Sequence, residues 1–178
     1  MRRIPVPSVC APLGAVCIAL GLAGCGERAP QERLKPPGPP PTPTLEQVKT
    51  ATISGVFDQA ITLAGGKYEG QPIEPGAASV PTAVLWEPTF HTADLDGSIG
   101  SEAVAMLSSN AGGSGEFVYL AVFGMRDGSF ANLATVPVGD RVRLQNLWLE
   151  RGKVVMDVIE AGPNDPACCP TQVTRKTF

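Results

Sequence analysis

The chain has 178 residues and a formal net charge of −3, with 17 Asp and Glu against 14 Lys and Arg. This length provides for one globular domain plus additional segments. The basic residues are scattered, so the sequence lacks the basic patch of a nucleic-acid-binding protein and predicts no nucleic-acid partner. It also lacks a polybasic cluster that would hold the chain to anionic lipid.

The first 24 residues are typical of a secretory signal peptide. Arg2 and Arg3 supply the positive start, and an apolar stretch follows over residues 9–22. The alternative is an uncleaved membrane anchor, but a span takes ~20 apolar residues and prolines and glycines interrupt this stretch. We therefore expect residues 1–24 to be removed as a signal peptide.

The signal ends in Leu22-Ala23-Gly24-Cys25, which resembles the lipobox of bacterial lipoproteins. The resemblance implies cleavage before Cys25, a diacylglyceryl thioether on its sulfur and an acyl chain such as palmitate on its amine. The protein would then be anchored in the membrane of the bacterial cell envelope through the acyl chains on Cys25, with its domain facing the periplasm or the exterior. In an envelope with two membranes, Gly26 resembles the residue that follows the cysteine in outer-membrane lipoproteins.

Residues 25–43 are predicted to be the lipidated cysteine and a proline-rich tether. Pro36-Pro37-Gly38-Pro39-Pro40-Pro41 favours extended polyproline II, which rises ~3.1 Å per residue. The alternative, a ligand for SH3-like domains, has no expected partner in a bacterial envelope. The tether would separate the membrane from a β-rich globular domain over residues 44–178.

This domain is predicted to be mostly β, either all-β or α+β, as an antiparallel meander or small barrel with a short N-terminal helix. Thr44 and Gln47 form a capping-box pattern for a helix over residues 45–51. Apolar runs at 83–86, 103–107 and 117–123 are strand candidates, and the first is expected to end at Pro88. Glycine-containing turns recur about every ten residues, which favours an antiparallel arrangement. The turn signals are Gly65-Gly66, Asp127-Gly128, Gly139-Asp140 and Arg151-Gly152.

Two further patterns concern the last strands. The apolar phase slips between Leu144 and Leu147, which predicts a β-bulge near Asn146. Arg175 and Lys176 predict that the last strand, over residues 171–178, lies at an exposed edge of a sheet.

Asp94-Leu95-Asp96-Gly97-Ser98-Ile99-Gly100-Ser101-Glu102 resembles the aspartate-rich calcium loops that precede strands in FG-GAP-like repeats. Such loops place oxygens at alternate positions and close with a carboxylate, so Asp94, Asp96 and Glu102 are candidate calcium ligands. Ser98 stands where a third Asp or Asn is expected, and Ile99 where the turn glycine is expected. The preferred interpretation is a loop that keeps the family shape without the metal, and no other cofactor is predicted.

Four segments together resemble a group of uncharacterised bacterial lipoproteins, over about residues 83–178. They are Asp94-Leu95-Asp96-Gly97, Gly112-Gly113-Ser114-Gly115-Glu116-Phe117, Gly139-Asp140-Arg141-Val142 and Cys168-Cys169-Pro170-Thr171. The resemblance implies location and domain type, and it brings no known activity.

Cys168 and Cys169 are candidates for a disulfide or a redox element. The other three cysteines lie in the signal or at the lipid site, which excludes a disulfide-dense scaffold. Adjacent Cα atoms lie ~3.8 Å apart, below the ~4.4 Å at which ordinary disulfides begin. One interpretation is a redox or ligand-contact element. The preferred one is a rigid turn between prolines that bridges or buries its sulfurs.

His91 is the only histidine, and no G-x-S-x-G elbow accompanies it. A single histidine also leaves too few ligands for a typical zinc site. The preferred function is a non-enzymatic, lipid-anchored module that binds an unknown envelope protein or ligand, or stabilises the envelope. The alternative is an envelope enzyme, either a hydrolase that uses His91 or a thiol redox protein that uses Cys168 and Cys169.

Overall fold

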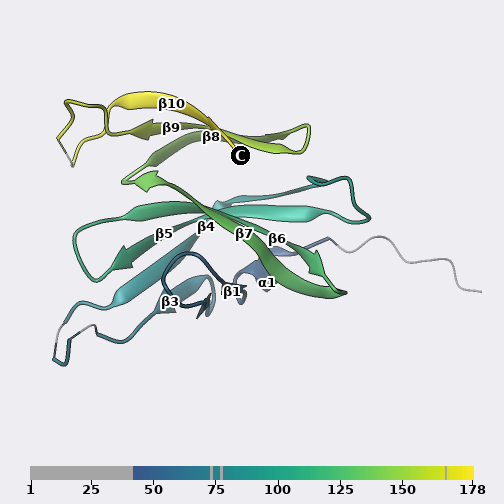
Figure 1. The fold of residues 1–178 in the computed structure, drawn as a ribbon, viewed down its shortest axis with the longest axis horizontal. Helices are drawn as coiled ribbons and strands as arrows, with labels where there is room; N and C mark the ends of the chain where they lie inside the picture. The colour runs from purple at the N-terminus through teal and green to yellow at the C-terminus, as the bar shows by residue number, and fades with distance from the viewer. Residues whose placement is uncertain (1–41, 73, 77, 167) are drawn as a thin grey trace, which may run out of the picture. The chain divides into compact units, whose positions relative to one another are not determined.

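A computed structural model describes residues 42–72, 74–76, 78–166 and 168–178, which belong to one compact unit. They form two antiparallel meanders and a small two-stranded sheet, which confirms the predicted mostly β fold with a short N-terminal helix (Figure 1). The elements are α1 (Leu45–Val48), β1 (Thr52–Ile53), β2 (Ile61–Thr62), β3 (Lys67–Glu69), β4 (Pro81–Ala93), β5 (Glu102–Ala111), β6 (Phe117–Arg126), β7 (Ser129–Asp140), β8 (Arg143–Glu150), β9 (Lys153–Glu160) and β10 (Gln172–Thr177).

The predicted signal peptide, Cys25 and nearly all of the predicted tether lie outside the described residues. Within the described part of the chain, no helix is long and apolar enough to cross a membrane.

The capping box at the start of α1 is present. The Thr44 backbone N–H donates to Gln47 Oε1 at 2.9 Å, and the Gln47 N–H donates to Thr44 Oγ1 at 3.3 Å. The helix ends at Val48, earlier than predicted. Ala51 cannot continue the helix because it extends the pairing of β1 with β2: its carbonyl accepts a hydrogen bond from the Leu63 N–H at 2.9 Å.

Three predicted two-residue turns are tight turns in which both residues have positive φ. The φ values are 61° and 82° at Gly65-Gly66, 51° and 77° at Asp127-Gly128, and 50° and 75° at Arg151-Gly152. This conformation is that of type I′ turns, whose twist matches the strands they join. The Gly65-Gly66 turn differs from the other two because the strands that it joins belong to different sheets. Strand β2 pairs with β1, and β3 pairs with β4.

Strand β4 passes through Pro88, so the expectation that it ends there is wrong. Its pairing with β5 shifts register between Trp86 and His91, and the proline lies in this irregular stretch, where a missing N–H is tolerated. The Thr89 hydroxyl accepts from the Met106 N–H at 2.8 Å and donates to the Trp86 carbonyl at 2.6 Å. A buried side chain thereby takes the place of backbone hydrogen bonds, and the strand continues.

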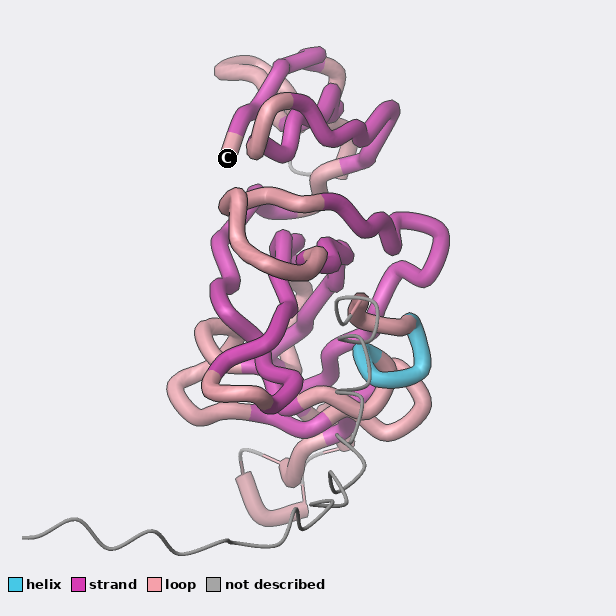
Figure 2. The backbone as a smooth tube through the Cα atoms, turned by 90° about the vertical axis from the view of Figure 1, so that its right-hand side faces the viewer, coloured by secondary structure: helices cyan, strands magenta, loops and turns pink. Residues whose placement is uncertain are grey.

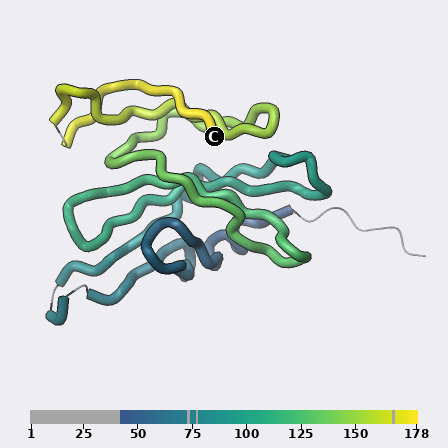
Figure 3. Tube along the Cα trace, in the orientation of Figure 1, coloured from purple at the N-terminus to yellow at the C-terminus, as the bar shows by residue number. Residues whose placement is uncertain are grey.

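Strand β5 is at the centre of the domain and is buried on both faces. Ala103, Ala105 and Leu107 belong to a core with the N-terminal segment that contains α1, β1 and β2. Val104 and Met106 belong to a second core with β8 and β9. The five-stranded sheet β3-β4-β5-β6-β7 therefore lies between the N-terminal segment and the three-stranded sheet, as Figures 2 and 3 show.

The three-stranded sheet has the order β10-β9-β8, so β10 is an edge strand as predicted. The register of β8 against β9 shifts between Leu144 and Asn146, which confirms the predicted bulge. Arg175 on the edge donates to both carboxylate oxygens of Asp157, at 2.7 and 3.0 Å. Its guanidinium also lies over the Trp148 ring, 5.0 Å from the centroid. The edge strand therefore carries a charged side chain, which disfavours pairing with a further strand.

Candidate functional site

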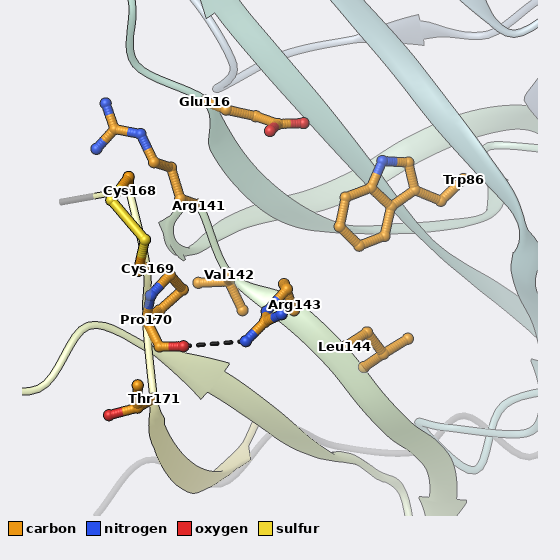
Figure 4. Close-up of a pocket in the computed structure, with 10 residues that line it drawn as sticks. All are labelled: Trp86, Glu116, Arg141, Val142, Arg143, Leu144, Cys168, Cys169, Pro170 and Thr171. Carbon is orange, nitrogen blue, oxygen red and sulfur yellow. Dashed lines mark hydrogen bonds between the residues drawn. A yellow bond between two sulfur atoms is a disulfide. The ribbon is translucent and has the colours of Figure 1, made fainter. Parts of the chain in front are cut away.

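A groove of about 780 Å³ opens beside the start of β8, and we call it the Trp86 groove (Figure 4). Strand β4 contributes Trp86, the segment before β6 contributes Glu116, and the β7–β8 connection with the start of β8 contributes residues 141–144. The loop between β9 and β10 contributes residues 168–171. Four segments that are distant in the sequence therefore form one concave site, as ligand sites commonly do.

The floor of the Trp86 groove is apolar. Val142 and Pro170 are buried, and Trp86 and Leu144 are half-buried. Trp86, Val142 and Leu144 also belong to the core between the two larger sheets, so packing holds them in place. The Trp86 indole N–H donates to Ser108 Oγ at 3.3 Å, which fixes the orientation of the ring. The floor is thus a preformed surface for an apolar group.

Three ionisable side chains border the groove, and only one of them has an ionic partner within the residues that the structure describes. Arg141 pairs with Asp140 at 2.8 Å and also donates to the Ser114 carbonyl at 3.0 Å. Arg143 donates one hydrogen bond, to the Pro170 carbonyl at 3.0 Å, which Figure 4 shows as a dashed line. Among the described residues, neither Arg143 nor the Glu116 carboxylate takes part in an ion pair.

The wall that carries Cys168 and Cys169 is held by Asp165. Its carboxylate accepts hydrogen bonds from the Gly162 N–H at 2.9 Å, the Thr171 N–H at 2.7 Å and the Thr171 hydroxyl at 2.9 Å. These donors favour the charged form and lower the pKa of Asp165 below its ordinary value, with the Gly162 and Thr171 backbone amides as the main causes. One carboxylate therefore joins the two ends of the 162–171 loop.

Cys168 and Cys169 are joined by a disulfide and line the groove. Both residues are exposed, so the version of the turn that buries its sulfurs is wrong. The physical reason is their position: Pro170 turns into the domain and is buried, while the two cysteines before it remain on the rim. The version in which the turn bridges its sulfurs fits the structure.

The three candidate calcium ligands lie together, away from the Trp86 groove. One carboxylate oxygen from each of Asp94, Asp96 and Glu102 lies within 4.8 Å of the others. The loop donates one backbone amide to each: Gly97 N–H to Asp94 at 2.7 Å, Ser98 N–H to Asp96 at 2.8 Å, and Leu95 N–H to Glu102 at 2.8 Å. Calcium binding by this cluster stays a prediction.

The turn of this acidic loop is made without Ile99. Gly97, at φ 76°, and Gly100, at φ 136°, supply the positive dihedrals that an isoleucine resists, and Ile99 is left 91 % exposed. The Ser98 N–H donates to Asp96 at 2.8 Å, and the Ser98 side chain and backbone are the main causes that lower the pKa of that carboxyl. Ser98 therefore supports Asp96 instead of offering a third acidic ligand.

His91 lies on β4 with its side chain exposed, and it does not line the Trp86 groove. Within residues 42–178, leaving aside the undescribed positions 73, 77 and 167, no hydrogen bond joins His91 to a serine or an aspartate. The structure thus supplies no Ser-His-Asp arrangement around it. Cys25, the predicted lipidation site, lies outside the described residues.

Sequence reasoning missed Trp86, Glu116 and Arg143 as site residues. None of them belongs to a motif with known chemistry, and they lie far apart in the chain. One signal was available: the sequence resembles uncharacterised bacterial lipoproteins in four segments, and three of them contribute to the groove, namely those containing Glu116, Arg141 and Cys168. Only the fourth segment, at Asp94, lies elsewhere.

Comparisons of this chain with protein-family models, with curated proteins and with solved structures found no match.

Proposed function

We propose that this protein is a lipid-anchored lipoprotein of the bacterial cell envelope whose β domain acts as a non-enzymatic binding module. The anchor is Cys25, supported by the pattern Leu22-Ala23-Gly24-Cys25 after an apolar stretch. At least two acyl chains are needed for stable attachment, because one chain gives only marginal membrane binding. The binding site is the Trp86 groove.

One observation carries the binding function: four segments distant in the sequence meet at a single groove with an apolar floor and ionisable side chains on its border. Its volume of about 780 Å³ falls in the range of small-molecule sites. An apolar floor bordered by a few polar groups is also the usual composition of such sites. The exposed disulfide beside it is of the kind that persists in oxidising compartments such as the periplasm, which supports an envelope location.

The anchor is tested by metabolic labelling with an alkyne fatty acid. The unaltered chain should incorporate the label and sediment with membranes, whereas Cys25→Ala should lose both properties. Cys17→Ala, which alters a cysteine inside the predicted signal, is the matched control and should keep the label. A Cys25→Ala protein that still carried the fatty acid would contradict the assignment.

The binding site is tested by photo-crosslinking in intact cells. A photoreactive residue at position 116, on the groove, should capture a ligand or partner. The same residue at position 151 should not, because Arg151 is exposed in the β8–β9 turn and does not line the groove. Equal capture at both positions, or capture at 151 alone, would contradict the groove as the binding site.

A second candidate function, a thiol redox protein, is favoured by the exposure of Cys168 and Cys169 on the groove wall. A thiol substrate bound in the groove would have direct access to the disulfide. Reduction of the bond by a small dithiol, followed by thiol-trapping mass spectrometry, measures its potential. A value near those of catalytic disulfides, about −120 to −270 mV, would favour this function, and one below about −300 mV would favour a structural bond.

A further inference from the structure

Two opposite charges on the Trp86 groove have no ionic partner in the described part of the chain. Arg143 uses one of its N–H groups on the Pro170 carbonyl, and its remaining N–H groups have no protein acceptor among the described residues. No hydrogen bond or ion pair involves the Glu116 carboxylate in the same part of the chain. The third charge, on Arg141, is already matched by Asp140.

The two unmatched charges line the same groove but do not pair with each other. In Figure 4 the Glu116 carboxylate points toward the Trp86 side and the Arg143 guanidinium toward the Pro170 side. Packing fixes the apolar residues between them, since Val142 is 3 % exposed and belongs to the core. The groove therefore presents a positive group, a negative group and an apolar floor.

A ligand with one charge matches only half of this arrangement. A ligand that fills the groove and carries only a negative charge would displace water from Glu116 without giving that carboxylate a donor, and one that carries only a positive charge would do the same to Arg143. Removing water from a charge without compensation is costly. A dipolar ligand offers an acceptor to the guanidinium and a donor to the carboxylate at once, so both charges stay satisfied.

We infer that the Trp86 groove binds a short peptide with a free ammonium group, a free carboxylate and an apolar side chain. This inference rests on the proposed function, because it takes the groove as the binding site. Arg143 holds the peptide carboxylate, and Glu116 accepts from the ammonium group. Trp86 and Leu144 contact the apolar side chain, while the Cys168–Cys169 wall closes one side. The groove volume of about 780 Å³ suits a ligand larger than one amino acid.

The test is calorimetric titration of the full-length protein, purified in detergent micelles, with three related peptides. The first is Ala-Phe-Ala with both termini free, the second its N-acetylated form, and the third its C-terminal amide. The free peptide should bind about tenfold more tightly than either blocked form, since each block removes one charge-assisted hydrogen bond. Equal affinity for all three, or no heat from any, would overturn the inference.

Two variants test which residue binds which charged end of the peptide. Arg143→Gln should lose the distinction between the free peptide and the amide, and Glu116→Gln the distinction between the free and the acetylated peptide. Arg151→Gln and Glu69→Gln, which alter exposed charges away from the groove, should keep both distinctions. If the controls change affinity as much as Arg143→Gln and Glu116→Gln do, the charges act non-specifically and the inference is wrong.

The outcome is separable from that of the proposed function. Loss of peptide discrimination in a protein that still carries fatty acid on Cys25 and crosslinks through position 116 would overturn the ligand class alone. A protein that discriminates the peptides but carries no fatty acid would instead contradict the anchor.

Discussion

Strand β5 and the 162–171 loop are held in place by different means. Residues 103–107 of β5 are all buried, and their side chains alternate between two cores. The loop has an exposed disulfide and is tied mainly by the Asp165 carboxylate and by Arg143 bonded to the Pro170 carbonyl. The strand depends on apolar burial and the loop on a few polar contacts.

Because of this difference, substitutions in β5 and in the loop should act on different properties: the first on the stability of the domain, the second on the shape of the Trp86 groove. A change at one position of β5 disturbs the core on which that side chain packs, and changes at neighbouring positions disturb the other core. A change in the loop reshapes one wall of the Trp86 groove and leaves both cores intact. Core substitutions should therefore cost the most free energy of unfolding, and loop substitutions should alter the groove at little cost.

The largest effect is expected for Met106→Ala. Met106 is fully buried against the three-stranded sheet, so its truncation removes apolar contacts and leaves a cavity worth about 2–5 kcal/mol. Its neighbour Ala105 is equally buried on the other face, and Ala105→Met should cost about 1–3 kcal/mol by overpacking. Denaturant unfolding followed by far-UV circular dichroism measures both. A loss below about 1 kcal/mol for Met106→Ala would contradict the tightly packed two-face core.

A smaller loss is expected for Thr89→Val, which keeps the shape of the side chain and removes its hydroxyl. The Met106 N–H and the Trp86 carbonyl then lose their partner inside the domain, which costs about 1–3 kcal/mol. Thr92→Val on the same strand is the control, since Thr92 is exposed and should stay within about 0.5 kcal/mol. Equal stability of the two variants in denaturant unfolding would show that the hydroxyl does not sustain the irregular stretch of β4.

The strands of the core and the Trp86 groove also differ in how far the sequence predicts them. Continuous apolar runs predicted β5 and β6, and the Asp127-Gly128 pair predicted the turn after them, because both signals are local. The passage of β4 through Pro88 was not predictable, since it depends on Thr89 reaching an amide on another strand. The Trp86 groove was missed for the same reason: its charges, Glu116 and Arg143, come together only through the fold.

Acid should loosen the 162–171 loop, because protonation of Asp165 weakens the hydrogen bonds that its carboxylate accepts. The pKa of Asp165 lies below its ordinary value of 3.8, so the folded state binds fewer protons than the unfolded state as the pH falls below that value. The contribution of Asp165 is therefore complete above pH 3.8 and is lost as the pH falls through its folded pKa. The Gly162 and Thr171 amide resonances should shift over this range in an NMR titration. In Asp165→Asn the shift should vanish; its persistence would assign the acid response to another group.

The smallest change in stability is expected for the double variant Cys168→Ser, Cys169→Ser. Both side chains are exposed, and a bond between adjacent residues closes almost no chain, so the free energy of unfolding should fall by less than about 1 kcal/mol. The groove should respond more than the stability does, because the two sulfurs form part of its wall. The affinity for Ala-Phe-Ala should therefore weaken while the unfolding midpoint stays near that of the unaltered protein. Leu107→Ala, at a fully buried position of the other core, should show the opposite: a large loss of stability with peptide discrimination retained in the fraction that remains folded. If the cysteine variant instead unfolded as readily as Met106→Ala, the loop would be part of the structural core, and the separation between stability and site would fail.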